Sequence, residues 1–310
     1  MLLLAALLIG WRYDRDITAA RARVARGGTV IATRCGPIEY QEAGRGVPLL
    51  AVHGSGGGYD QGMAFAGALA QRGIRVIAMS RFGYLRTPMP ADASAEAQAD
   101  AHVCLLDALG IRQAGVAGGS AGAPSALQMA IRHPDRVLAL VLLVPMAYKP
   151  GGVADSAPPL PGWIENTMLR VLGSDFLFWS ALQVARKPVT RVVLATPPAL
   201  LDAASPAERA RVNAMLDGIL PVSARAAGLR SDTAASKRLA PAALESIRVP
   251  TRVISVRDDG YGTYASAQYT ASRIPGARFI GFETGGHTWV GHDAEVLSEI
   301  AALLVAPERP

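Results

Sequence analysis

The stretch Gly115–Gly122 constrains the fold of this 310-residue chain more than any other. It follows the short extended run Ile111–Ala114 and precedes Pro124–Arg132, whose apolar residues recur at helical spacing. Ser120 therefore lies at a predicted corner between a strand and a helix. A glycine stands two residues before it and another two residues after it, and such small residues let strand and helix approach closely around a sharp turn.

Extended runs alternate with helical patterns along most of the chain. Extended runs are predicted over residues 29–33, 38–42, 47–52, 74–79, 136–144, 251–256 and 277–282. Asp60 and Ser94 are expected to cap two of the intervening helices. Strands that alternate with helices predict an α/β protein with a doubly wound, mostly parallel sheet and helices on both faces.

The alternation stops near Pro145 and resumes near Thr251. The segment between them opens with prolines and continues with helical patterns over Trp163–Leu172, Phe176–Ala185, Pro206–Leu220 and Val222–Gly228. We interpret this segment as a helical cap inserted between two core strands. The predicted domains are an N-terminal segment at 1–26, a core formed by 27–148 and 246–310, and the cap at 149–245.

The candidate chemistry centres on Ser120, because function in such sheets concentrates at the carboxyl ends of the strands. Serine is a poor nucleophile unless a base removes its proton and an acidic group orients that base. Of the five histidines, His287 alone combines a late position, a loop after a strand and neighbouring glycines. We predict that His287 is the base, with His292 as the alternative.

Two carboxylates follow the strand that ends at Val256, and either suits the orienting role. We favour Asp259 over Asp258, because it lies further past the strand. The developing oxyanion also needs backbone N–H donors. The predicted donors are Ala121, directly after the serine, and Ser55, in the glycine run that follows an earlier strand.

Together these residues resemble the α/β-hydrolase superfamily, in the motifs His53–Gly57, Gly118–Gly122, Asp259 and Gly285–His287. The resemblance implies the α/β-hydrolase fold with a cap and a triad in the order serine, aspartate, histidine. It further implies a serine esterase that cleaves a small carboxylic ester or related acyl bond through an acyl-enzyme, without cofactor or metal.

Three other functions remain open at this point. Acyl transfer or perhydrolysis would use the same triad with a different acceptor, and a carbon–carbon bond hydrolase would use it on a different bond. A protein that kept the fold and lost turnover would only bind a ligand. The net charge of +6 comes with arginines scattered along the chain, so we expect no nucleic-acid partner.

The two cysteines, Cys35 and Cys104, form neither a metal pattern nor a disulfide framework in the sequence. Cys104 falls in a helical run, and we expect it to be buried as a small apolar residue.

The apolar run Met1–Ile9 is followed by aromatic residues and arginines. It has about half the ~20 apolar residues that cross a bilayer, so the pattern indicates an interfacial or membrane-anchoring helix. We therefore expect a cytoplasmic or membrane-associated protein, with membrane contact through residues 1–26. The alternatives are a frayed hydrophobic terminus and a truncated longer segment.

Overall fold

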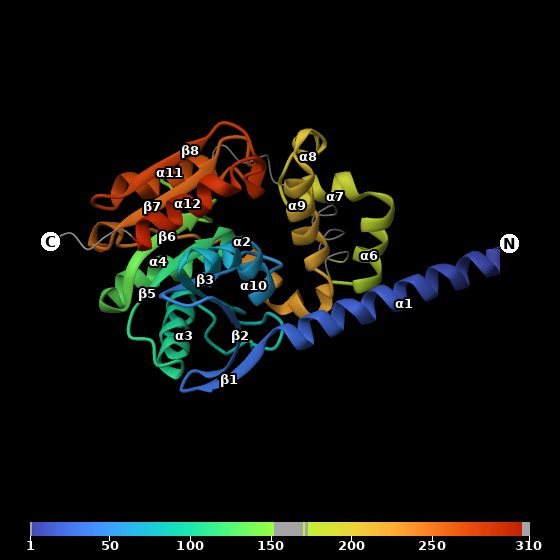
Figure 1. Ribbon diagram of the computed structural model, residues 1–310, viewed down its shortest axis with the longest axis horizontal. Coiled ribbons are helices and arrows are strands. Elements are labelled where there is room, and N and C mark those ends of the chain that lie inside the picture. The colour runs from blue at the N-terminus through green and yellow to red at the C-terminus, as the bar shows by residue number, and fades with distance from the viewer. Residues whose placement is uncertain (1, 152–169, 171–172, 306–310) are drawn as a thin grey trace.

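The computed structural model describes residues 2–151, 170 and 173–305. Its centre is a sheet with strand order β1-β2-β4-β3-β5-β6-β7-β8 (Figure 1). The strands are β1 (Thr29–Thr33), β2 (Gly36–Ala43), β3 (Val47–Val52), β4 (Ile74–Met79), β5 (Ala114–Gly119), β6 (Val137–Leu143), β7 (Thr251–Val256) and β8 (Arg278–Phe282). β2 runs antiparallel to β1 and β4, and all other neighbours are parallel. The predicted mostly parallel α/β sheet is confirmed.

Helices cover both faces of this sheet. They are α2 (Tyr59–Ala66), α3 (Ala95–Ala108), α4 (Ala123–Arg132), α11 (Thr263–Arg273) and α12 (Asp293–Leu304). In β3, Leu50 and Val52 pack with α3, α4 and α11, whereas Leu49 and Ala51 pack on the face of α2 and α12. Successive side chains point to opposite faces, so a strand buried on both sides reads as a continuous apolar run.

One of the two predicted helix caps is confirmed. The Ser94 side chain accepts a hydrogen bond from the Ala97 N–H at 3.1 Å at the start of α3. The prediction for Asp60 is wrong, since α2 begins after Gly58 and Asp60 lies within its first turn. The Asp60 carboxylate instead pairs with Arg225 at 2.6 Å.

Strand β5 lies later in the sequence than the extended run Ile111–Ala114 suggested, because it includes the glycines before Ser120. Glycine is disfavoured in strands, but here larger residues do not fit. A β-carbon at Gly115 would lie 2.3 Å from a methyl group of Leu304, and one at Gly118 would lie 2.7 Å from the Ala126 β-carbon. Tertiary packing therefore overrides the local propensity.

The inserted cap lies between β6 and β7. Its helices are α6 (Asp175–Val184), α7 (Arg186–Val193), α8 (Pro198–Ala203), α9 (Pro206–Gly218) and α10 (Ala226–Ser236). The sequence analysis missed α7 and α8, although Pro188 in the first turn of α7 is compatible with a helix. The predicted helix Trp163–Leu172 lies outside the described residues except for Arg170. The domain boundaries stay predictions.

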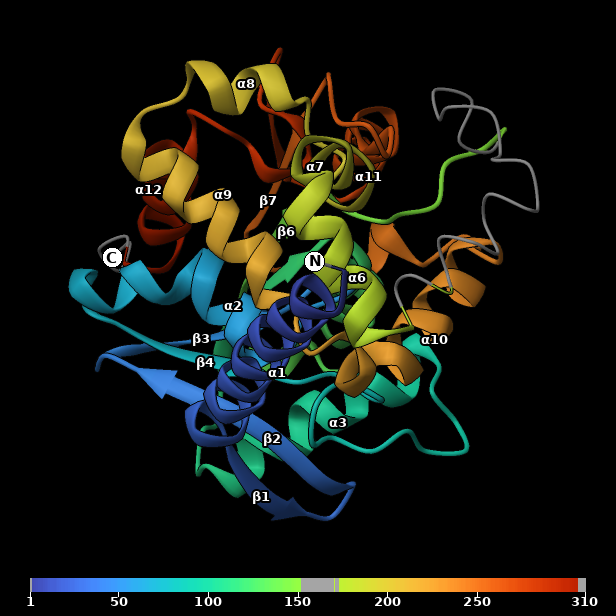
Figure 2. The same cartoon turned by 90° about the vertical axis from the view of Figure 1, so that its right-hand side faces the viewer.

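The N-terminal residues form one long helix, α1 (Leu2–Gly27). It runs beside α6, and its N-terminal end stands clear of the body (Figures 1 and 2). Over the described ranges, every helix is too short or too polar to cross a membrane.

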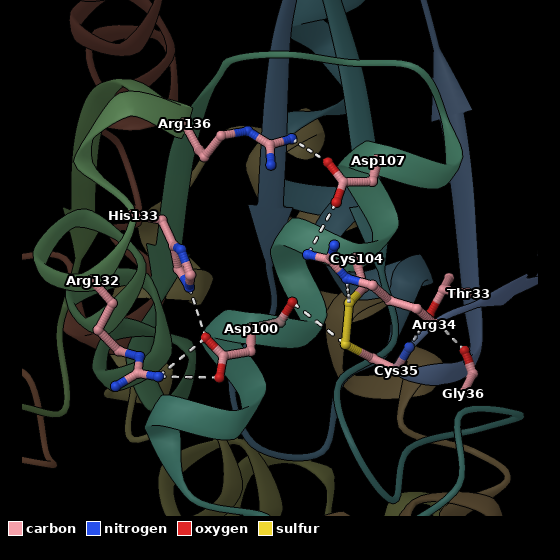
Figure 3. Close-up of a disulfide and its surroundings, with 10 residues drawn as sticks. All are labelled: Thr33, Arg34, Cys35, Gly36, Asp100, Cys104, Asp107, Arg132, His133 and Arg136. Carbon is pink, nitrogen blue, oxygen red and sulfur yellow. Dashed lines mark hydrogen bonds and ion pairs between the residues drawn. A yellow bond between two sulfur atoms is a disulfide. The ribbon is translucent and has the colours of Figure 1, made fainter.

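Cys35 and Cys104 form a disulfide, with an S–S distance of 2.08 Å and a Cα–Cα distance of 6.0 Å (Figure 3). The interpretation that the sequence holds no disulfide framework is therefore wrong, although Cys104 is buried as predicted, at 2% exposure. The bond ties the turn between β1 and β2 to α3. Sequence spacing gave no sign of it, because the two residues are 69 positions apart.

Removing this disulfide should destabilise the protein. Closing a loop of this length restricts the unfolded chain, so we expect Cys35→Ser to lower the free energy of unfolding by about 2–4 kcal/mol. Urea denaturation with and without a reductant measures the change. The reductant should affect the wild type and leave Cys35→Ser unchanged. A wild type that is equally stable in both conditions would contradict the prediction.

Candidate active site

Ser120 occupies the turn between β5 and α4, as predicted. Its φ angle is +48°, in the left-handed region that residues with a β-carbon rarely adopt. The surrounding structure fixes this conformation, and the Ser120 carbonyl accepts a hydrogen bond from the Met146 N–H at 3.1 Å. Backbone strain of this kind clusters at functional sites, where neighbouring contacts over-determine the geometry.

The glycines around Ser120 are required by close contacts. A β-carbon at Gly122 would lie 2.5 Å from the Val52 carbonyl oxygen, at the carboxyl end of β3. One at Gly54 would lie 2.9 Å from the β-carbon of Ser120. Any larger residue at these positions would separate the serine from the glycine loop after β3.

Asp259 and His287 are brought together from the loops after β7 and β8. His287 Nδ1 lies 2.8 Å from Asp259 Oδ2. The same carboxylate accepts hydrogen bonds from the Thr263 hydroxyl and, at 2.9 Å, from the Tyr261 N–H. Burial acts to raise the pKa of Asp259, but His287 and these donors outweigh it and hold the pKa below its usual value. Asp259 is therefore ionised at neutral pH.

Asp258 and His292, the two alternatives, have other partners. Asp258 Oδ1 accepts a hydrogen bond from the Gly286 N–H at 2.7 Å and so holds the backbone of the His287 loop. His292 Nε2 lies 2.9 Å from the Thr284 carbonyl oxygen, and its ring stacks on Phe282. The geometry thus favours Asp259 and His287 as the interacting pair.

A cap residue also positions both loops. The Ala195 carbonyl, between α7 and α8, accepts hydrogen bonds from the N–H groups of Gly260 at 3.0 Å and His287 at 3.3 Å. A β-carbon at Gly286 would lie 2.8 Å from atoms of Thr196. Sequence reasoning missed this contact, because it uses backbone atoms and no side-chain motif marks it.

The remaining predicted residues lie at the same edge of the sheet. Ser120 follows β5 and His287 follows β8, both at the carboxyl ends of parallel strands. Within the described residues, no hydrogen bond joins the Ser120 hydroxyl to His287. Ala121 lies in the first helical turn after the serine, where N–H groups have no intrahelical acceptor. Ser55 lies in the glycine loop, and its hydroxyl donates to Asp232 at 2.9 Å.

His53 supports this glycine loop, a role that the sequence analysis did not assign. Its Nε2 accepts the Arg81 N–H at 2.9 Å, so in the matching tautomer Nδ1–H donates to the Gly54 carbonyl at 2.7 Å. Burial, followed by the nearby charge of Arg81, lowers the pKa of His53 well below its usual value. The neutral ring therefore fixes the loop that carries Ser55.

Arg81 connects the loop to the cap. Its guanidinium forms two hydrogen bonds with Asp232 on α10, at 2.9 and 2.6 Å, and a third with the His53 carbonyl at 2.8 Å. The Tyr84 hydroxyl also donates to Asp232. Arg81 and Asp232 are both buried. Asp232 was not identified from the sequence, since an isolated aspartate in a helix carries no motif.

A cavity of about 60 Å³ lies beside the Ser120 turn, between α3, α4 and α10. Ala121, Gln98 and Arg81 contribute to its lining. Gln98 is 4% exposed, and its Oε1 accepts the Phe82 N–H at 2.8 Å, which sets the orientation of the amide. Among the described residues, Gln98 Nε2 has no hydrogen-bond partner. A buried donor in this state costs about 1–3 kcal/mol, so a ligand acceptor there would be favoured.

Comparison with known proteins agrees with this architecture. A family model described as the alpha/beta hydrolase fold matches residues 47–290, and the chain belongs to that family. A solved alpha/beta hydrolase fold protein from Nakamurella multipartita is similar, with a TM-score of 0.70 and 30% identity. That match covers 89% of this chain and 98% of the other.

Two curated relatives match shorter segments. The 2-hydroxymuconate semialdehyde hydrolase of Pseudomonas putida is 41% identical over 105 residues, which is 33% of this chain and 37% of the relative. The 2-hydroxy-6-oxo-6-phenylhexa-2,4-dienoate hydrolase of Comamonas testosteroni is 32% identical over 130 residues, or 40% of this chain and 44% of the relative. The chain thus spans less than half the length of each.

Two buried histidines, His53 in the glycine loop and His102 in α3, predict a stability that falls with acidification. Burial lowers the pKa of His102 to about 3, and that of His53 is lowered too, whereas unfolded histidine titrates near pH 6.5. Below that value the unfolded state binds more protons. The free energy of unfolding should therefore fall by about 1.4 kcal/mol per pH unit for each histidine, while most carboxylates stay ionised.

Urea denaturation between about pH 7 and pH 5 tests this. His102→Gln should lose about half of the slope, because only His53 then remains neutral on folding. If the free energy of unfolding of the wild type stays constant over this interval, His53 and His102 are not held neutral in the folded protein.

Proposed function

We propose that this protein is a serine hydrolase that cleaves a small carboxylic ester through an acyl-enzyme intermediate. The observation that carries the proposal is the contact of His287 with the buried Asp259, at 2.8 Å, at the same sheet edge as the left-handed Ser120. A catalytic serine needs an oriented base, and this pair supplies one.

In the proposed mechanism, His287 Nε2 removes the proton of the Ser120 hydroxyl as the oxygen attacks the carbonyl carbon. The N–H groups of Ala121 and Ser55 donate to the oxygen that becomes negative. His287 then gives the proton to the leaving alcohol, and the acyl group stays on Ser120. Water repeats the sequence to release the acid, while Asp259 stabilises the charged imidazole in each half.

A carbon–carbon bond beside a carbonyl is the second candidate. The names of the two curated relatives denote oxo or aldehyde acids that contain no ester. Attack of Ser120 on such a carbonyl would release a carbon leaving group, which takes the electron pair and then a proton. Gln98 Nε2, which has no partner among the described residues, favours this candidate, because it would hydrogen-bond a carboxylate or hydroxyl oxygen of an oxo acid.

The neighbouring aspartates provide a matched test of the mechanism. Asp259→Asn removes the charge that stabilises the imidazolium, and we expect it to lower kcat for a p-nitrophenyl ester on the order of a thousandfold. Asp258→Asn keeps an oxygen that accepts the Gly286 N–H, so its kcat should stay within roughly tenfold of the wild type. Equal losses in the two variants would contradict the assigned roles. A folded wild type that turns over neither an ester nor an oxo acid would indicate a ligand-binding protein.

Gln98→Glu separates the two substrate classes. Glutamate keeps the oxygen that accepts the Phe82 N–H but removes the Nε2 donor. We expect KM for a 2-hydroxy-6-oxo-dienoate to rise by roughly tenfold or more, with little change for p-nitrophenyl acetate. Steady-state kinetics on both substrates measures this. An unchanged KM for the dienoate would exclude Gln98 from its binding.

A further inference from the structure

The proposed hydrolytic site leaves helix α1 without a role. The C-terminal half of the helix packs on the body through Ile17, Ala20 and Val24, which are all buried. Tyr13 contacts the aromatic residues of α6, with its ring 5.1 Å from Phe176 between centroids. These positions recur every three or four residues, so they form one face of the helix.

The N-terminal half of α1 exposes large apolar side chains. They are Leu3 at 75%, Leu4 at 72%, Leu7 at 62%, Leu8 at 57%, Ile9 at 48% and Trp11 at 60% exposure. This part of the helix extends past α6 into open space (Figure 1). An exposed apolar patch of this kind marks a surface that is covered by a partner or a membrane.

Basic and aromatic residues follow the apolar segment directly. Leu3, Leu7, Trp11 and Arg15 follow at steps of four and therefore form one stripe. The Arg15 guanidinium lies 5.3 Å from the centre of the Trp11 ring. Over its whole length, α1 carries five arginines against two aspartates. This order of apolar, aromatic and basic residues is typical of helices that lie in a membrane interface.

The apolar surface continues onto the cap. α6 runs beside α1 (Figures 1 and 2), and Arg12 hydrogen-bonds Gln183 on α6 at 3.4 Å. α6 exposes Phe176 at 44%, Leu177 at 45% and Val184 at 86%. Two separate elements thus expose apolar side chains in one part of the molecule.

We propose that the segment Leu3–Trp11, together with these side chains of α6, inserts into the interface of an anionic lipid bilayer. Arg12 and Arg15 then contact lipid phosphates, Arg15 in exchange for its exposed ion pair with Asp16 at 2.8 Å. The charge of α1 favours anionic lipid over a second copy of the chain as the partner. Two arginine-rich helices repel each other, whereas anionic lipid attracts each of them. In this arrangement, the cap is the part of the protein outside α1 that lies nearest to the lipid.

Vesicle sedimentation of the full chain tests the proposal, with phosphatidylcholine vesicles that contain or lack phosphatidylglycerol. We expect binding to the anionic vesicles that weakens with salt, and the double variant Leu7→Glu/Leu8→Glu should bind at least roughly tenfold more weakly. The matched control is Val305→Glu, which places the same residue at an exposed apolar position after α12 and should bind like the wild type.

Because the substituted side chains are exposed, circular dichroism and urea denaturation should show the same fold and stability in all variants. Wild-type protein that does not bind anionic vesicles, or a double variant that binds as well as the wild type, would overturn the proposal. Light scattering without lipid measures whether the chain forms dimers. A dimer that the double variant dissociates would instead identify a second copy of the chain as the occupant.

Discussion

The left-handed turn at Ser120 is the constraint on which the rest of the site depends. A side chain at a φ of +48° is held there only if its neighbours leave no alternative. Gly54 and Gly122 allow the carboxyl ends of β3 and β5 to meet around the serine, since a β-carbon at either position would overlap backbone or side-chain atoms. In the proposed mechanism, the N–H of Ala121, directly after the serine, then donates to the developing oxyanion.

The cap acts on this site through polar contacts at two points. Asp232 on α10 forms a buried ion pair with Arg81, in the loop after β4, and accepts a hydrogen bond from the Ser55 hydroxyl in the glycine loop. The Ala195 carbonyl, between α7 and α8, holds the loops of Asp259 and His287. Any movement of the cap would therefore alter both the proposed oxyanion donors and the proposed base.

Much of the fold was predictable because buried strands, glycine turns and helical spacing are local signals. Asp259 and His287 could be identified from the sequence for the same reason, since each follows a recognisable strand. The contacts of Asp232 and Ala195, and the partner of Cys35, depend on residues far apart in sequence that carry no pattern of their own. The strand before Ser120 was predicted too early in the sequence, because close packing against α4 and α12 outweighs the low strand propensity of glycine.

Whether Ser120 is an activated nucleophile is the central claim, and covalent labelling with a fluorophosphonate probe tests it most directly. The wild type and Ser120→Ala would be treated in parallel and the adduct located by mass spectrometry of peptides. We expect a single adduct on Ser120 that is absent from the variant. A folded wild type that remains unlabelled, or an adduct on another serine that persists in Ser120→Ala, would contradict it.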